Sequence, residues 1–206
     1  MRTLNQSTKK KTLHATLREI VAEIEEDQYM LMEYLSPVVD GCRAALSVSL
    51  RSAREASFSD EDFQRYMDVA GDSFRDISIC FAPADSEDRF SIVFDGSKVY
   101  LVEDCEDPDV VIGGPTSVLR DLMDADAKMS PVDELGETVR VSGRDSRDVV
   151  VGLGLLCFPS LLRMARAGVD PSSLLAEDAD AVIMAAATDM VTKIVRKWID
   201  LHLEAM

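Results

Sequence analysis

The stretch Phe90-Ser-Ile-Val-Phe-Asp-Gly-Ser-Lys-Val-Tyr-Leu-Val102 decides the fold of this chain of 206 residues. Phe90, Ile92 and Phe94 recur at every second position, which is the period of a half-buried β-strand. Asp95-Gly96 supplies the positive φ angles that a two-residue hairpin turn requires. Residues 98–102 are β-branched and aromatic, as a return strand prefers. The stretch therefore predicts an antiparallel hairpin.

Three further segments extend this hairpin into a sheet. Residues 77–81, 109–112 and 138–141 alternate or run apolar as strands do. Gly113-Gly114 ends the second of them, and Pro115 suits the first position of a short helix. Because one face of such a sheet must be buried by helices, we expect an α+β fold with a mainly antiparallel, helix-covered sheet.

Apolar periodicity predicts helices on both sides of the sheet segment. One helix spans residues 12–35, and Ser36-Pro37 opens the second helix of a hairpin. A third begins at Ser59 with a capping-box-like start and reaches Ala70. Asp145 caps a helix that Pro159 must kink or divide. We expect three parts, namely an N-terminal helical extension over 1–57, the sheet domain over 58–170 and a C-terminal helix within 171–206 that packs on the domain or on a partner.

The order of these elements carries a resemblance to a known family. The run Pro108-Asp-Val-Val-Ile-Gly-Gly-Pro-Thr-Ser-Val-Leu-Arg-Asp-Leu-Met123, followed by Thr138-Val-Arg-Val-Ser-Gly143, resembles the sterol-carrier-protein type-two (SCP2-like) lipid-transfer domain. The match covers about residues 58–168 and departs at Asp124-Ala-Asp-Ala127, where the family often has glycine. The resemblance implies non-enzymatic binding of fatty acids, acyl-CoA or sterols in an apolar cavity between sheet and helices.

The helices that would roof such a cavity carry the candidate ligand-binding residues. Methionine suits an adaptable pocket wall, although the same side chains suit an ordinary close-packed core. The candidates are Leu119, Leu122, Met123, Phe158, Leu161, Met164, Met190 and Trp198.

The charge of the chain limits its partners. Its net charge is −16 and its pI is near 4.4, so a nucleic-acid backbone would repel it. Thirteen carboxylates lie between Glu103 and Asp148. They lack the spacing of a calcium loop, and a solvated surface explains them better than a metal site.

Catalytic chemistry has little material in this sequence. Only two histidines occur, His14 and His202, each on a predicted helix near a chain end. The four cysteines show no Cys-x-x-Cys pair, so we expect neither a disulfide framework nor a zinc site. Gly152-Leu-Gly154 lacks the third glycine of a dinucleotide-binding turn. We therefore expect no enzyme, no cofactor and no metal.

Location and assembly complete the expectations. The N-terminus lacks the apolar core of a secretory signal, and the run Val149 to Phe158 is far shorter than the roughly 20 residues of a membrane helix. We expect a cytoplasmic protein without stable membrane insertion. The alternative to a lipid carrier is an interaction module without a ligand, in which helices over 12–57 and 178–206 form a homo-oligomer or dock a protein partner beside a close-packed sheet domain.

Overall fold

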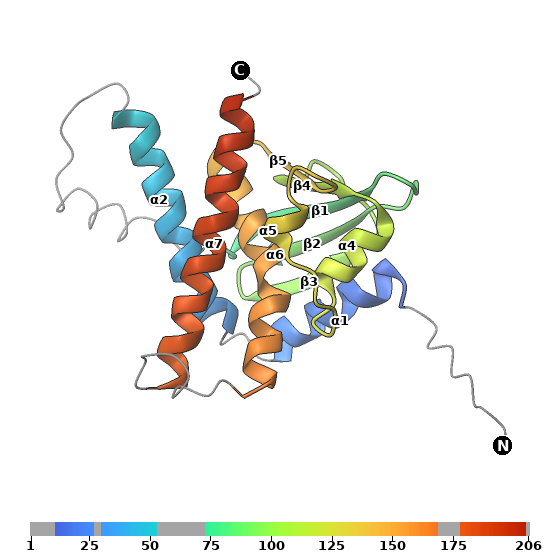
Figure 1. Ribbon diagram of the computed structural model, residues 1–206. Coiled ribbons are helices and arrows are strands. Elements are labelled where there is room, and N and C mark those ends of the chain that lie inside the picture. The colour runs from blue at the N-terminus through green and yellow to red at the C-terminus, as the bar shows by residue number, and fades with distance from the viewer. Residues whose placement is uncertain (1–10, 27–29, 53–72, 169–177, 205–206) are drawn as a thin grey trace.

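A computed structural model describes residues 11–26, 30–52, 73–168 and 178–204 (Figure 1). Five strands form one sheet in the order β3-β2-β1-β4-β5. The pairs β1–β2, β2–β3 and β4–β5 are antiparallel, whereas β1 and β4 are parallel. The predicted α+β class is confirmed, and the sheet is mixed. Its strands are β1 (Asp76–Pro83), β2 (Phe90–Asp95), β3 (Lys98–Val102), β4 (Val110–Gly114) and β5 (Arg140–Gly143).

The predicted hairpin is present with its turn displaced by one residue. Asp95 is still in β2 and pairs with Lys98, so the two turn residues are Gly96 and Ser97. Gly96 has a φ of 60°, the left-handed conformation that glycine adopts without a steric cost. The fifth strand is also displaced, because it begins at Arg140 rather than at 138, where the prediction placed its start.

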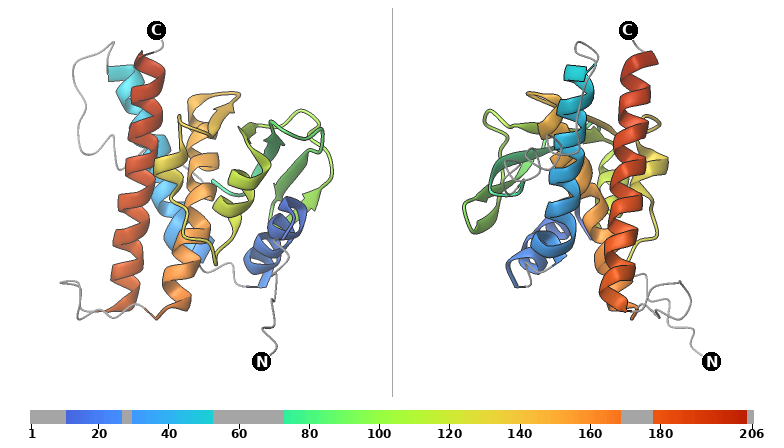
Figure 2. Two further views of the ribbon diagram at one scale, coloured as in Figure 1. Left: turned by 45° about the vertical axis from the view of Figure 1, so that its right-hand side comes forward. Right: turned by 90° about the vertical axis from the view of Figure 1, so that its left-hand side faces the viewer.

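The two faces of the sheet differ in what covers them. Ile79, Phe81 and Ile92 have no exposed surface and belong to the hydrophobic core. Side chains alternate along a strand, so Cys80 and Ser91 point to the opposite face. Figure 2 shows the helices gathered on one side of the sheet, and α1, α4 and α6 contact its strands.

The helices follow the predicted order with several corrections. Residues 12–35 do not form one α-helix, because the described part ends at Glu26 and resumes as a π-helix at Met30. The helix predicted over 59–70 lies outside the described residues. Pro115 precedes the helix after β4 as its N-cap residue instead of occupying its first position. The helices are α1 (Leu13–Glu26), η1 (Met30–Leu35, the π-helix), α2 (Ser36–Ser52), α4 (Thr116–Met123), α5 (Pro131–Glu134), α6 (Ser146–Arg166) and α7 (Ala179–Glu204).

Helix α6 is the centre of the molecule. It packs on β4 and β5 on one side and on α2 and α7 on the other (Figure 1). Every residue from Val149 to Leu161 is buried, which is the pattern of a helix enclosed on all sides. Pro159 lies inside this helix, which continues through it as one element, so the proline does not divide the helix. Packing on both sides holds the helix together across the hydrogen bond that proline cannot donate.

Two glycines let α6 approach its neighbours closely. A Cβ atom on Gly152 would lie 2.6 Å from Cγ1 of Val110 in β4, and one on Gly154 would lie 2.4 Å from Cγ2 of Val39 in α2. The pair Gly152-Leu-Gly154 is therefore explained by packing between helix and sheet and between two helices.

Helix α6 is also the one described helix long and apolar enough to cross a membrane by length and composition. Its best window has a mean hydropathy of 1.6, and 72% of that window is buried inside the protein. The apolar run noted in the sequence extends only from Val149 to Phe158. Helix α6 is longer than this run because it continues through Pro159 to Arg166. Its burial is that of a core helix.

A single hydrophobic cluster connects the three predicted parts of the chain. It includes Leu17 of α1, Ile92 of β2 and Val191 of α7, together with the buried apolar residues of α6. The N-terminal and C-terminal helices thus share their core with the sheet.

Candidate functional site

The predicted ligand-binding residues lie in or against this core. Leu119 and Met123 of α4 and Phe158 and Leu161 of α6 are at most 1% exposed, and Leu122 is 3% exposed. Helices α4 and α6 contact one another, and all five residues belong to the same hydrophobic core cluster. Met164 and Met190 are half-buried on α6 and α7. None of the eight predicted residues lines either of the two larger grooves described below.

Trp198 faces the edge of the sheet. Its indole Nε1 donates a hydrogen bond to the backbone carbonyl oxygen of Val141 in β5, at 3.0 Å. Its ring packs against the imidazole of His202, with ring centroids 3.9 Å apart. Trp198 thereby attaches α7 to β5.

The first groove lies between the helical layer and the turn end of the β2–β3 hairpin. We call it the hairpin groove. Its volume is about 350 Å³ and it is open on one side to solvent. Apolar side chains come from α1, η1, the residue before β1, and strands β2 and β3; they are Ile24, Leu31, Met32, Phe74, Phe94 and Val99.

The walls of the hairpin groove are rigidly packed at their base. The rings of Phe74 and Phe94 are in tilted contact, with centroids 5.3 Å apart. Phe94 is 4% exposed and Val99 is 2% exposed, so the groove is shallow above them. Met32 is the half-buried member of the lining and has the most flexible side chain.

Charged residues surround the mouth of the hairpin groove. Arg75 and Lys98 line it and are exposed. Asp76 directly follows Arg75, and Asp95 lies three residues before Lys98. The Asp76 carboxylate accepts a hydrogen bond from the backbone N–H of Gly96 at 3.3 Å. The mouth therefore carries both signs of charge above an apolar base.

A second groove of about 400 Å³ is lined by residues of α1, η1, α6 and α7. Its apolar residues include Met30, Leu162 and Ile183. Arg166 and Glu23 also line this groove and form an ion pair with one another.

The start of α4 is already occupied by a carboxylate of this chain. Asp85, in the loop between β1 and β2, accepts hydrogen bonds from the backbone N–H of Thr116 at 2.8 Å and from the Thr116 hydroxyl. These bonds lower the pKa of Asp85. An external anion at Gly113-Gly114-Pro115 would have to displace this carboxylate.

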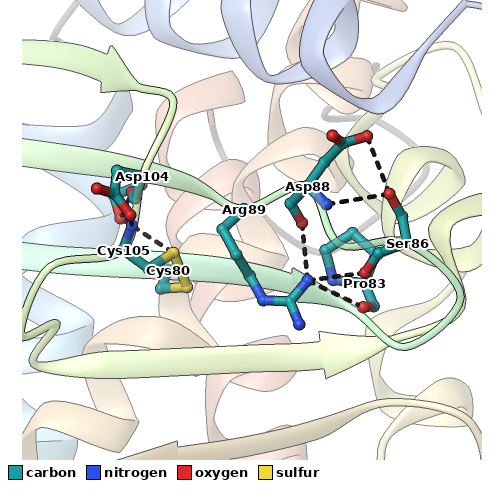
Figure 3. The surroundings of a disulfide bond; sticks show 8 residues. Cys80, Pro83, Ser86, Asp88, Arg89, Asp104 and Cys105 are labelled. Atoms are coloured by element: carbon teal, nitrogen blue, oxygen red, sulfur yellow. Dashed lines mark hydrogen bonds between the residues drawn. A yellow bond between two sulfur atoms is a disulfide. The ribbon is translucent and has the colours of Figure 1, made fainter.

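Arg89 gives the loop that carries Asp85 its shape. Its Nη1 donates to three backbone carbonyl oxygens within the loop, those of Pro83, Ser86 and Asp88, at 2.8–3.3 Å (Figure 3). The loop sequence alone contains no signal for this arrangement, because one guanidinium joins carbonyl groups several residues apart.

The histidines make local contacts. His14 stacks on Phe90 at a centroid distance of 5.3 Å, and its Nε2 lies 3.1 Å from the Glu103 carboxylate. The Nδ1 of His202 lies 2.9 Å from the carbonyl oxygen of Trp198. Within the described residues, no three His, Cys, Asp or Glu side chains are placed to hold a metal ion.

The cysteine prediction is wrong for two of the four residues. Cys80 in β1 and Cys105 in the loop before β4 form a disulfide bond (Figure 3). Twenty-five residues separate them, so their spacing in the sequence did not show the pairing. Cys42 and Cys157 are free thiols. Burial raises the pKa of Cys157 to about 12, which keeps this thiol protonated and unreactive.

Comparison with known proteins adds no relative. No family model, curated protein or solved structure matches the chain. The function must therefore be argued from the grooves and side chains themselves.

Proposed function

We propose that this chain is a non-enzymatic binding protein for an apolar small molecule, such as a fatty acid, acyl-CoA or a sterol-like lipid, and that it is SCP2-like in fold and role. The observation that carries the proposal is the hairpin groove, an open space of about 350 Å³ with an apolar base and a charged mouth, between the helical layer and the turn end of the β2–β3 hairpin. The sequence resemblance indicates the same kind of ligand between the same two layers.

The chemistry of the groove suits this role. Burial of a hydrocarbon chain contributes about 0.8 kcal/mol per methylene group, so a few methylenes over Phe74 and Phe94 give useful affinity without any reaction. The groove is open on one side to solvent, and Met32 can adopt several rotamers at small cost, so its wall can adapt to a ligand. Polar ends of the ligand remain at the open, charged mouth.

The direct test is the recovery of a ligand. Organic extraction of the purified protein followed by mass spectrometry should yield a lipid in stoichiometric amount, and a fluorescent fatty acid should bind the delipidated protein. Absence of both signals would refute the proposal. Light scattering on the same samples shows whether binding depends on self-association through the terminal helices.

Matched variants locate the site. Met32→Trp fills the hairpin groove and should weaken binding by about tenfold or more, which corresponds to 1.4 kcal/mol. Met190→Trp is the control, because Met190 is also a half-buried methionine but lies on α7 away from the groove. Loss of binding in Met190→Trp alone would assign the ligand to the helical layer instead.

A further inference from the structure

The disulfide holds an acidic loop against the sheet face opposite the core. Cys80 is on the central strand β1, directly opposite Ser91 of β2. Both side chains point away from the helices and are at most 3% exposed. The Ser91 hydroxyl donates to the carbonyl oxygen of Asp104 at 2.7 Å and lies 3.3 Å from Sγ of Cys105. The loop after β3 therefore folds back across β2 to reach β1.

The loop concentrates negative charge around this bond. Glu103, Asp104, Glu106 and Asp107 flank Cys105, and all four are exposed. Their mutual repulsion favours release of the loop from the sheet. Besides the disulfide and Ser91, exposed side-chain contacts hold the loop. The Nε2 of His14 lies 3.1 Å from the Glu103 carboxylate, and Arg144 forms an ion pair with Asp107 at 2.7 Å and donates a hydrogen bond to its carbonyl oxygen at 2.6 Å. Exposed ion pairs contribute little, so the covalent bond is the main constraint.

The two sulfur atoms differ in access. Cys80 is 2% exposed, whereas Cys105 is half-buried in a surface loop. An incoming thiolate can therefore reach Cys105 and not Cys80. The carboxylates around Cys105 repel anionic reagents and raise the local concentration of cationic ones.

We infer that the Cys80–Cys105 bond is a reversible redox lock on the loop 103–107, and that small cationic thiols open it faster than anionic ones. A thiolate attacks Sγ of Cys105 and forms a mixed disulfide there. The bond to Cys80 breaks, and Cys80 leaves with the electron pair and takes up a proton. A second thiol releases Cys105, so that the reagent is oxidised to its disulfide and the protein gains two thiols.

Opening the lock frees the loop from the middle of the sheet. Reduction leaves the Ser91 hydrogen bonds and the exposed contacts of Glu103 with His14 and of Asp107 with Arg144 as its attachments. Repulsion among the four carboxylates then favours an extended loop, whose backbone at Glu103 and Glu106 can enter the active site of a glutamate-specific protease. Where the surroundings are reducing, disulfides of this kind are usually transient and redox-sensing.

The experiment measures how fast the full-length protein is reduced by cysteamine and by glutathione, with rates corrected for the thiolate fraction of each reagent. Mass spectrometry after alkylation counts the thiols, and buried Cys157 should not react. At low salt we expect cysteamine to act about tenfold faster than glutathione. The difference should shrink at high salt. It should also shrink in the isosteric variant Glu103→Gln/Asp104→Asn/Glu106→Gln/Asp107→Asn.

Loop release has its own readout. The rate of cleavage at Glu103 and Glu106 should rise at least severalfold on reduction and return to its original value after reoxidation. Without reductant, Cys105→Ser should be cleaved as fast as the reduced natural protein. Equal rates for the two thiols at low salt would overturn the charge selectivity. Cleavage that does not respond to reduction, or four alkylated cysteines in the native protein under oxidising conditions, would overturn the lock. If the fourfold variant does not fold, the salt dependence of the native protein decides.

Discussion

The indole Nε1 of Trp198 lies 3.0 Å from the carbonyl oxygen of Val141 and donates a hydrogen bond to it. Val141 belongs to β5, an outer strand of the sheet, so its outward carbonyl has no neighbouring strand to bond. Helix α7 supplies the missing donor. Lys197, one residue earlier, donates to the carbonyl oxygen of Val132 at 2.7 Å. Two consecutive side chains thus attach α7 to β5 and α5.

Trp198→Phe should destabilise the fold by about 1 kcal/mol. The substitution keeps an aromatic ring beside His202 but removes the donor, which leaves the Val141 carbonyl dependent on water. Urea denaturation followed by circular dichroism measures the change. Leu203→Ala is the control, because Leu203 is 60% exposed and its loss should alter the free energy of unfolding by less than about 0.5 kcal/mol.

The strands were predictable where apolar residues recur at every second position. Phe90, Ile92 and Phe94 do so in β2, so the strand could be assigned directly, although the burial of Ser91 on the opposite face was not predictable from this pattern. The parallel pairing of β1 with β4 was not predictable, because both segments are apolar and their partners lie far apart in the chain. The π-helix at Met30 also escaped prediction, since its apolar residues fit an α-helical period equally well.

Gly154→Ala should destabilise the protein by about 1–3 kcal/mol. Its new methyl group would lie 2.4 Å from Cγ2 of Val39, whose side chain is completely buried and cannot move away. Thermal denaturation measures the loss. Gly113→Ala provides the control, because the nearest atom to a Cβ there is the Ala82 carbonyl oxygen at an ordinary 3.6 Å.

The double variant Val39→Ala/Gly154→Ala tests the cause. Removing the two Val39 methyl groups makes room for the new one, so the two destabilising effects should not add. Strict additivity would mean that Gly154 is required for a reason other than its distance from Val39.

The candidate site was less predictable than the fold. Apolar residues such as Phe158 and Leu161 look the same in sequence whether they line a cavity or fill a core, and here they lie in the core. The hairpin groove joins Ile24 and Met32 to Phe94 and Val99, which are about 70 residues away along the chain. Such a juxtaposition depends on how α1 and η1 lie against the hairpin, and no local pattern encodes it.

Asp145→Ala should remove the cap of α6 and cost about 1 kcal/mol at neutral pH. The carboxylate accepts hydrogen bonds from the backbone N–H groups of Arg147 and Asp148 at 2.7 and 3.0 Å. Partial burial opposes ionisation, but these bonds and the Arg147 side chain prevail and lower the pKa of Asp145. The stabilisation is therefore present above the unfolded pKa of about 4 and is lost as pH falls through the lower folded value. The unfolding free energies of the two proteins should converge as the pH falls below the folded pKa of Asp145; a constant difference would show that the charge is not involved.

Asp148→Asn should change the pH dependence in the opposite direction. Burial, followed by the nearby carboxylate of Asp145, raises the pKa of Asp148 despite the Arg43 guanidinium 3.8 Å away. Because its folded pKa lies above the unfolded value, protonated Asp148 favours folding at low pH, and this contribution is lost as pH rises through the folded pKa. Asparagine keeps the shape without the charge, so the variant should be more stable than the natural protein at pH 7 and lose that advantage below about pH 4. Urea denaturation across this pH range measures both effects. Lower stability of Asp148→Asn at pH 7 would mean that the ion pair with Arg43 outweighs the cost of burying the charge.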